Sequence, residues 1–277
     1  MKIKSDLHTH SLYSDGEWTV EELIKEAKNK SLYAYALTDH DTVRGVNEAL
    51  ELGKKYGVNV IKGMELSSIK NGDVHILGLG IDADDRKLLR RLDDVVAKRK
   101  IRNHEVVLRL NELGMPVDEE ELHRIGEGKI VGRKLISELM IKRGYAKTVA
   151  EAFDKYLASG KPAYVPLVRL TPFDAIDVIH EAGGYAVLAH PSKLLFKGAE
   201  LEAFIRELAA YGLDGIEAYY YSHSPEEAEY YSLLAKELKL FKTGGSDFHG
   251  MYRNSRIGDV SGDAEREVLD MLLAKNS

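Results

Sequence analysis

The 277-residue sequence contains no cysteine, no glutamine and a single tryptophan, and none of its apolar runs is long enough to span a membrane. Without cysteine there is no disulfide and no thiolate metal site, so any bound metal ion must be held by His, Asp or Glu. The first ten residues also lack the apolar core of a signal peptide. We therefore expect a cytoplasmic protein with no membrane partner.

The charge balance is mildly acidic. The chain has 45 Asp and Glu against 39 Lys and Arg, a formal net charge of -6, which gives no general reason to expect duplex DNA as a partner. The sequence has no GxxxxGK[ST] phosphate loop and no GxSxG nucleophile elbow. These absences argue against a P-loop nucleotide hydrolase and against a serine hydrolase of the α/β type.

Short apolar runs followed by amphipathic helical patterns recur along the chain. Seven runs are typical of buried strands: residues 3–7, 33–37, 59–61, 74–80, 186–188, 215–218 and 240–243. Thr19 and Ser224 each begin a helix, and Glu22 or Glu227 completes a capping box three residues later. This alternation predicts an α/β fold with a parallel sheet, either open or closed into a barrel.

The alternation is interrupted between about Asp84 and Pro166, where only helical patterns occur. Residues 86–113 are typical of one long charged helix, and shorter helices are expected around residues 133–143 and 148–157. The segment is either a helical excursion between two strands or a subdomain that covers the site, and we favour the second. The predicted domains are a discontinuous barrel, residues 1–83 and 167–277, and an all-helical insertion, residues 84–166.

Side chains that bind metal ions follow the predicted strands. Six histidines lie near the C-terminal end of a predicted strand or in the turn after it, and three carboxylates accompany them: His8, His10, Asp15, His40, Glu65, His75, His190, Asp247 and His249. In parallel α/β folds the C-terminal strand ends carry the active site. A single pair such as His8 and His10 is more often a pair of ordinary polar residues. Nine together are not expected for structural reasons alone, because buried unpaired imidazoles and carboxylates are costly.

The residue types therefore predict a cluster of two or three divalent ions, Mn²⁺, Fe²⁺ or Zn²⁺. Ions held this close together suit phosphoester hydrolysis, because they activate water and offset charge on the phosphoryl oxygens. Asp6, Asp39 and Asp41 flank the ligands, and they either cap turns or orient ligand imidazoles.

Other residues allow two interpretations. His223 follows a predicted strand and precedes a helix N-terminus. One interpretation is that it binds phosphate or protonates a leaving oxygen, and the other is that it is a surface residue. Trp18 and the run Tyr219, Tyr220 and Tyr221 either stack on a base or, more often, pack in the core or rim. We interpret the remaining histidines in helical patterns as ordinary core or surface residues: His104, His123 and His180.

The ordered motifs HTHSLYSDG, LTDHDT, GMELS, HILG, AHP and GSDFHG resemble the PHP superfamily, named for polymerase and histidinol phosphatase, over nearly the whole chain. The resemblance implies a distorted (β/α)7 barrel with metal ions at the strand C-termini. It also implies three ligand sets. One ion would be held by His8, His10, Glu65 and Asp247, a second by Glu65, His75 and His190, and a third by Asp15, His40 and His249.

The helical segments are similar to the branch of this superfamily that acts on nucleoside 3′,5′-bisphosphates, some members of which are also 5′→3′ exoribonucleases on short RNA. The similarity implies that the 3′-phosphate of a nucleotide is removed, and it favours Arg133 as a phosphate contact over a solvated charge at a helix start, since guanidinium binds phosphate bidentately. Lys161 follows a Ser-Gly turn and is either a further phosphate contact or an ordinary surface residue. Where that branch usually reads Arg-Pro-His, this chain reads Arg133-Lys134-Leu135. The alternatives are a phosphatase for histidinol phosphate or a cyclic phosphodiester, and a non-catalytic metal-binding docking module.

Overall fold

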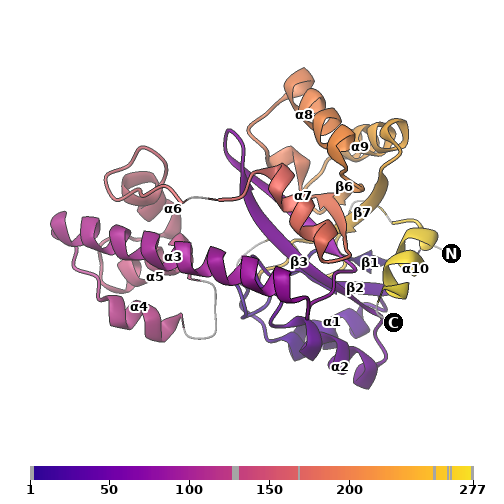
Figure 1. The fold of residues 1–277 in the computed structure, drawn as a ribbon. Coiled ribbons are helices and arrows are strands. Elements are labelled where there is room, and N and C mark those ends of the chain that lie inside the picture. The colour runs from indigo at the N-terminus through magenta and orange to yellow at the C-terminus, as the bar shows by residue number, and fades with distance from the viewer. Residues whose placement is uncertain are drawn as a thin grey trace. The chain divides into compact units, whose positions relative to one another are not determined.

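The computed structural model describes residues 3–126, 131–167, 169–251, 254–260, 262 and 264–275. The chain forms two compact units (Figure 1). The first, here called the barrel unit, comprises Met1–Arg91 and Arg169–Ser277, and the second, the helical unit, is Leu92–Val168. Each unit is described by itself.

Seven strands form one sheet in chain order: β1 (Ser5–Asp6), β2 (Ala34–Leu37), β3 (Val60–Ile69), β4 (Asp73–Leu79), β5 (Tyr185–Leu188), β6 (Gly215–Tyr220) and β7 (Phe241–Gly245). Backbone hydrogen bonds join the two edges, because the Leu7 amide donates to the Gly244 carbonyl (3.0 Å) and the His10 amide to the Phe248 carbonyl (2.9 Å). The sheet is therefore a nearly closed barrel, and the predicted distorted (β/α)7 fold is confirmed.

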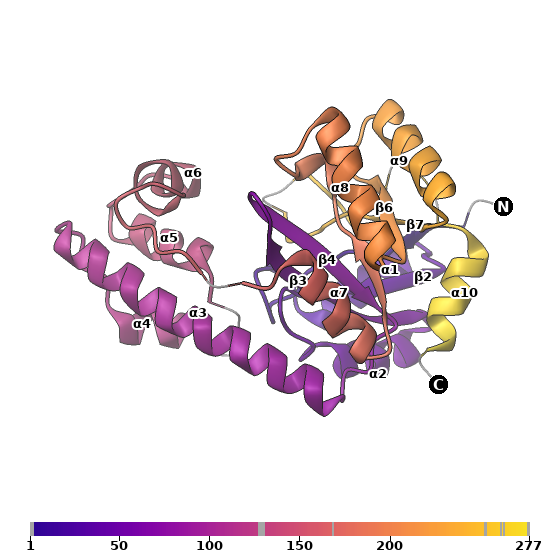
Figure 2. The same ribbon diagram turned by 45° about the horizontal axis from the view of Figure 1, so that its top comes forward.

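The expectation of a parallel sheet was wrong for one strand, because β4 runs antiparallel to both β3 and β5. Strands β3 and β4 lie side by side in Figure 2. A tight hairpin joins β3 to β4, and its Asn71 and Gly72 have φ values of 53° and 129°. An Asn-Gly pair between strands is a strong hairpin signal, since both residues tolerate positive φ. Because β4 is reversed, its N-terminal half lies where the parallel strands end.

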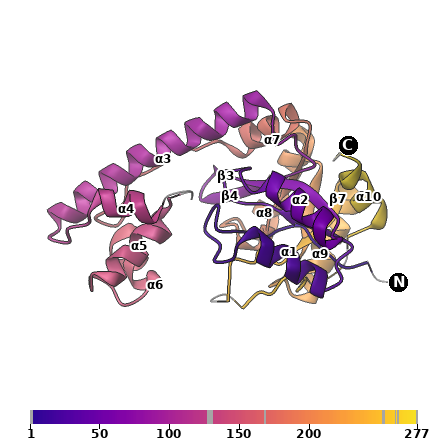
Figure 3. The same ribbon diagram turned by 90° about the horizontal axis from the view of Figure 1, so that it is seen from below.

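Six α-helices and one 3-10 turn complete the described part of the barrel unit: α1 (Val20–Asn29), α2 (Val46–Tyr56), α7 (Pro172–Glu181), η2 (Pro191–Lys193), α8 (Gly198–Tyr211), α9 (Pro225–Leu238) and α10 (Arg266–Ala274). The capping boxes predicted at Thr19 and Ser224 are both present. Helices α1 and α2 lie side by side on the outside of β2 and β3 (Figure 3).

Strand β2 is apolar on both faces, which explains its continuous apolar sequence. Ala34 and Ala36 face the barrel interior, where they share a core with Leu269 and Leu272 of α10, whereas the alternate residues pack against α1. The hydroxyl of Tyr33, the residue before β2, hydrogen-bonds to Asp270 of α10. Helix α10 therefore lies at the end where β2 begins, and the opposite end is left for polar groups.

The described residues of the helical unit contain helices and no strand: most of α3 (Arg86–Glu112), then α4 (Glu119–Ile125), α5 (Arg133–Lys142), α6 (Val149–Ala152) and the π-helical η1 (Phe153–Leu157). The unit has its own core, which includes Val106, Leu110, Ile136 and Leu139. Its boundary at Leu92 falls inside α3, eight residues after the one expected from the sequence. No described helix combines the length and apolar composition needed to cross a membrane.

Candidate metal centre

All nine predicted ligands lie in the barrel unit. Most follow a strand that ends at the polar end of the barrel: His8, His10 and Asp15 follow β1, His40 follows β2, His190 follows β5, and Asp247 and His249 follow β7. Two do not follow the pattern expected from the sequence. Glu65 lies inside β3, which is longer than predicted, and His75 is the third residue of β4, which reaches the site because it is antiparallel.

Glu65 is the centre of the cluster. Its side chain is fully buried, and its two oxygens lie within 3.3 Å of ring nitrogens from five histidines: His8, His10, His40, His75 and His190. Oε2 faces the first three rings and Oε1 faces the last two. A carboxylate whose two oxygens face different imidazole sets has the geometry needed to bridge two cations.

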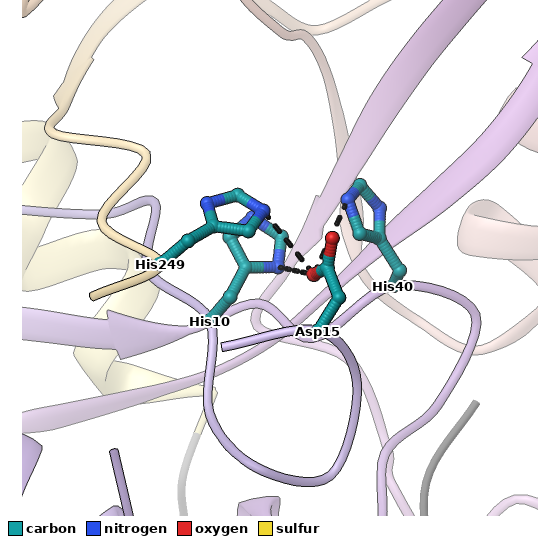
Figure 4. A group of neighbouring side chains, drawn as sticks. All are labelled: His10, Asp15, His40 and His249. Carbon is teal, nitrogen blue, oxygen red and sulfur yellow. Dashed lines mark ion pairs between the residues drawn. The ribbon is translucent and has the colours of Figure 1, made fainter. Parts of the chain in front are cut away.

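Asp15 is the centre of a second group (Figure 4). Its Oδ1 lies 3.2 Å from His249 Nε2, 3.9 Å from His40 Nε2 and 4.0 Å from His10 Nδ1. One ligand atom from each of these four side chains lies within 4.8 Å of the others. His10 and His40 therefore face both the Asp15 group and Glu65, so the ligand groups overlap more than the three implied sets suggest.

Asp247 joins the two groups on another side. Its Oδ1 is 3.2 Å from His10 Nε2, 3.5 Å from His8 Nε2 and 3.3 Å from His249 Nδ1. Its Oδ2 accepts a hydrogen bond from the Tyr220 hydroxyl (2.9 Å). The tyrosine thus forms a hydrogen bond with one carboxylate oxygen of Asp247, while the other oxygen faces the imidazoles. This contact of Tyr220 with a candidate ligand was not predicted from the sequence.

The donor atoms fit divalent cations. Several buried ring nitrogens lie near these carboxylates but form no hydrogen bond with any described residue: His8 Nε2, both nitrogens of His10, His40 Nδ1, His75 Nδ1 and His249 Nε2. Buried polar atoms are almost always satisfied, and leaving them unpaired is costly. Neutral imidazole and carboxylate together are good ligands for Mn, Fe and Zn ions, which would satisfy these atoms.

The pKa shifts show how strongly the groups interact. Burial would raise the pKa of the Glu65 carboxyl, but the imidazoles of His40 and His8 hold it well below its usual range. Burial lowers the pKa of His40, but Glu65 and Asp15 outweigh it and raise that pKa to about 9. Burial, with His10 nearby, lowers the pKa of His249 to about 4. Without metal ions, protons therefore provide part of the positive charge that the carboxylates require.

The three flanking aspartates bind backbone that is distant in the sequence, which differs from the local turn capping and from the orientation of ligand imidazoles that were predicted for them. Burial raises the pKa of Asp6 to about 6 and raises that of Asp39. Each accepts a hydrogen bond from a backbone amide in a segment of the site: Asp6 from Ser246 (2.9 Å), Asp39 from Ser11 (2.7 Å) and Asp41 from Ser67 (2.8 Å). These bonds hold the loops that carry the ligands.

Glu217 of β6 contacts the cluster and was not predicted from the sequence. The residue is fully buried, its Oε1 lies 3.0 Å from His8 Nδ1, and its Oε2 accepts the His190 amide at 2.7 Å. A charged residue inside a run of buried apolar residues was the signal available in the sequence, because such a charge requires partners.

Two of the three predicted substrate contacts lie in the helical unit. The half-buried Arg133 guanidinium donates to the Leu157 carbonyl (3.2 Å) and lies 5.5 Å and 5.7 Å from the ring centres of Phe153 and Tyr164. Lys161 is also half-buried, and its Nζ lies 3.5 Å from Asp154 Oδ1. Arg133 is thus held by a carbonyl and two aromatic rings, whereas Lys161 lies beside a carboxylate.

The third contact, His223, is buried in the loop after β6. Its Nδ1 lies 2.9 Å from the Ala218 carbonyl, to which it donates, and its Nε2 has no hydrogen-bond partner among the described residues. Its ring centre is 5.4 Å from that of Tyr220, which is 5.6 Å from that of His190. The side chain is therefore no surface residue, and it lies next to residues of the cluster.

The remaining candidates lie outside the cluster. Trp18 packs edge-on against Phe248, with ring centres 4.9 Å apart. His104 pairs with Glu119 at the surface, and His180 pairs with Asp214. The side chain of His123 lies outside the described residues.

Comparison with known proteins gives consistent results. The PHP domain family matches residues 6–245. The chain is 35% identical to the 5′-3′ exoribonuclease Rnm of Escherichia coli, over 88% of this chain and 84% of that protein. It is 33% identical to the 3′,5′-nucleoside bisphosphate phosphatase of Chromobacterium violaceum, over 88% and 86%. It is 31% identical to the phosphoribosyl 1,2-cyclic phosphate 1,2-diphosphodiesterase of Eggerthella lenta, over 89% and 94%.

A solved structure from Bifidobacterium adolescentis, suggested to be a metal-dependent phosphoesterase, superposes with a TM-score of 0.85 at 26% identity. The superposition covers 99% of this chain and 96% of the other.

Proposed function

This chain belongs to the PHP domain family of metal-dependent phosphoesterases, and on that premise we propose that it hydrolyses the 3′-phosphate of nucleoside 3′,5′-bisphosphates. The product would be a 5′-mononucleotide and phosphate. The observation that carries the proposal is the ring of five imidazole nitrogens within 3.3 Å of the buried Glu65 carboxylate. We propose all nine cluster residues as ligands of two or three Mn²⁺, Fe²⁺ or Zn²⁺ ions.

Divalent ions at this site would activate water and offset the negative charge of the phosphoryl group. The chain's own residues prepare the site for that task. Glu65, Asp15 and Asp247 supply negative charge that balances the cations, and Tyr220 holds one oxygen of Asp247. Because Glu65, Asp247 and the Oδ1 atom of Asp15 are buried, their attraction for a cation is screened little by water.

We propose that the helical unit binds the phosphate that is not cleaved, through Arg133 and, more weakly, Lys161. Lys and Arg outnumber Asp and Glu in residues 92–168, although acidic residues prevail in the whole chain. A guanidinium held by two aromatic rings and a carbonyl has little side-chain entropy left to lose when it binds phosphate.

His223 is the substrate contact we propose within the barrel unit. Burial lowers its pKa, so Nε2 is an acceptor at neutral pH in the free protein. It can accept a hydrogen bond from a ribose hydroxyl, or bind phosphate once the substrate's negative charge favours the protonated ring. His223→Asn should therefore lower the rate, while the remote His180→Asn should not.

The test is phosphate release from adenosine 3′,5′-bisphosphate in the presence of Mn²⁺. We expect AMP and phosphate in equal amounts. Arg133→Met should raise KM at least about tenfold, as expected for the loss of a charged hydrogen bond. Arg143→Met is the matched control in the same unit, because Arg143 is paired with Glu121 at 2.6 Å. If a generic phosphoester is cleaved and the bisphosphate is not, the proposed substrate is wrong, whereas metal-dependent phosphoester hydrolysis is still supported.

Two related substrates require parallel assays. The similarity to a 5′-3′ exoribonuclease supports RNA as an alternative substrate of this chain, and stepwise release of mononucleotides from the 5′ end of short RNA would identify that activity. The similarity to a cyclic phosphate diphosphodiesterase supports a cyclic phosphodiester, and ring opening without free phosphate in the first product would identify that activity. The ratio of kcat/KM values among these substrates and histidinol phosphate decides between them.

A further inference from the structure

Glu217 makes two hydrogen bonds to the proposed ligands, and both of its oxygens are used. Oε1 faces His8 Nδ1 at 3.0 Å and Oε2 accepts the His190 backbone amide at 2.7 Å. The neighbouring strand leaves space for this pair, because a Cβ atom at Gly245 would lie 2.4 Å from Glu217 Oε1 and 2.3 Å from His8 Cβ. A side chain at position 245 would therefore displace Glu217 or His8.

The contact with Glu217 fixes which nitrogen of neutral His8 carries the proton. A carboxylate only accepts hydrogen bonds, so Nδ1 must donate and the lone pair must lie on Nε2. Nε2 is the atom that lies 3.3 Å from Glu65 Oε2 and 3.5 Å from Asp247 Oδ1. The lone pair therefore points to the place where an ion would be bound by these carboxylates.

The second oxygen of Glu217 acts on the backbone of another proposed ligand. His190 has φ 28° and ψ 61°, a conformation that costs a non-glycine residue on the order of 1–3 kcal/mol and must be held by its surroundings. The hydrogen bond from its amide to Glu217 provides such a restraint, and the His190 ring places Nε2 3.2 Å from Glu65 Oε1.

We propose that Glu217 is a positioning residue of the metal centre, which sets the tautomer of His8 and the backbone of His190 and thereby sets the affinity for metal ions. The inference rests on the proposed ligand set, but not on the proposed substrate. Groups that orient metal-binding histidines in this way typically contribute 10- to 100-fold in metal affinity.

Glu217→Gln tests the proposal because glutamine has nearly the same shape. The His190 amide can only donate, so the glutamine oxygen should turn toward it and the NH₂ group toward His8 Nδ1. Nδ1 must then accept, which moves the ring proton to Nε2 and blocks the ion. We expect the affinity for Mn²⁺, measured by calorimetry on metal-free protein, to fall about 10- to 100-fold.

Asp214→Asn is the matched control. Asp214 precedes the same strand and also accepts from a histidine ring and a backbone amide, His180 Nε2 at 2.7 Å and the Ala186 amide at 2.8 Å. His180 is not among the proposed ligands, so this variant should bind Mn²⁺ like the wild type. Equal losses of affinity in the two variants, or unchanged affinity in Glu217→Gln, would overturn the proposal.

A double-mutant cycle separates positioning from general stability. In a His8→Ala background, Glu217→Gln should cost clearly less metal affinity than in the wild type, because the tautomer effect has been removed. Additive losses would count against the idea.

If Glu217→Gln does not fold, NMR of the imidazole nitrogens in the zinc-loaded wild type still tests the predicted tautomer of His8. We expect a proton on Nδ1 of His8, and a proton on Nε2 would overturn the proposal. A wild type that binds Mn²⁺ with this tautomer but cleaves no nucleotide would refute the proposed function alone.

Discussion

Replacing Glu65 with Gln removes the charge at the centre of the cluster while keeping its volume. In the metal-free protein, the pKa of His40 is raised from 6.5 to about 9, with Glu65 as the strongest of the raising influences. A shift of that size corresponds to about 3 kcal/mol, because each pKa unit is worth about 1.4 kcal/mol. This is the largest pH-dependent stability that the His40 contact can contribute.

The sign follows from the raised pKa in the folded state. Protonated His40 stabilises the metal-free protein fully below pH 6.5, and the contribution is lost as the pH rises through about 9. Between pH 6 and pH 9, the free energy of unfolding of the wild type should therefore fall by up to about 3 kcal/mol more than that of E65Q. His8 should add to this fall, because its pKa is also raised.

Urea unfolding of both metal-free proteins at pH 6 and pH 9 measures this difference. E65Q should also bind at least one metal ion fewer per chain and lose at least about 10²-fold in turnover. Glu207→Gln is the control, because Glu207 pairs with Lys70 at the surface and should change neither property. A stability difference between E65Q and wild type that is independent of pH would refute the electrostatic reasoning.

The described contacts lead to three further predictions. Metal binding at pH 7 should release protons, and the apparent affinity for the metal should rise between pH 6 and pH 9. The reason is that an ion must displace the proton that His40 holds with a pKa of about 9. Calorimetry in buffers of different ionisation enthalpy measures the proton release, and metal binding without proton release would contradict the prediction. Tyr220→Phe should weaken Mn²⁺ binding about tenfold by removing the 2.9 Å bond to Asp247; unchanged affinity would show that the bond is unimportant. Leu269→Ala should lower the free energy of unfolding by about 2–5 kcal/mol, because Leu269 is fully buried in the barrel core; a loss well under 1 kcal/mol in urea unfolding would mean that α10 contributes little.

The convergence of the nine candidate ligands was predictable from the sequence because strand ends and turns are marked by local patterns. Histidines that gather beside such marks in an α/β chain are typical of an active site, since the C-terminal strand ends carry it. The direction of β4 could also have been predicted from the sequence, because Asn71 and Gly72 form a typical hairpin pair. The alternation of strands and helices elsewhere in the chain favoured a parallel sheet instead. That error also placed His75 at the wrong end of its strand.

The partners of the ligands were not predictable in the same way. The contact of Glu217 with His8 joins residues 209 positions apart, and no local period indicates which strands become neighbours in a barrel. The orientation of Arg133 likewise depends on Phe153 and Tyr164, which approach it only when the helical unit has folded.

The most direct test of the central claim is a titration of metal-free protein with Mn²⁺ while phosphate release from adenosine 3′,5′-bisphosphate is followed. We predict that activity is absent at first, rises only after more than one ion is bound per chain, and reaches its maximum at two to three. Full activity with one ion or fewer, or activity that survives complete chelation, would contradict the account.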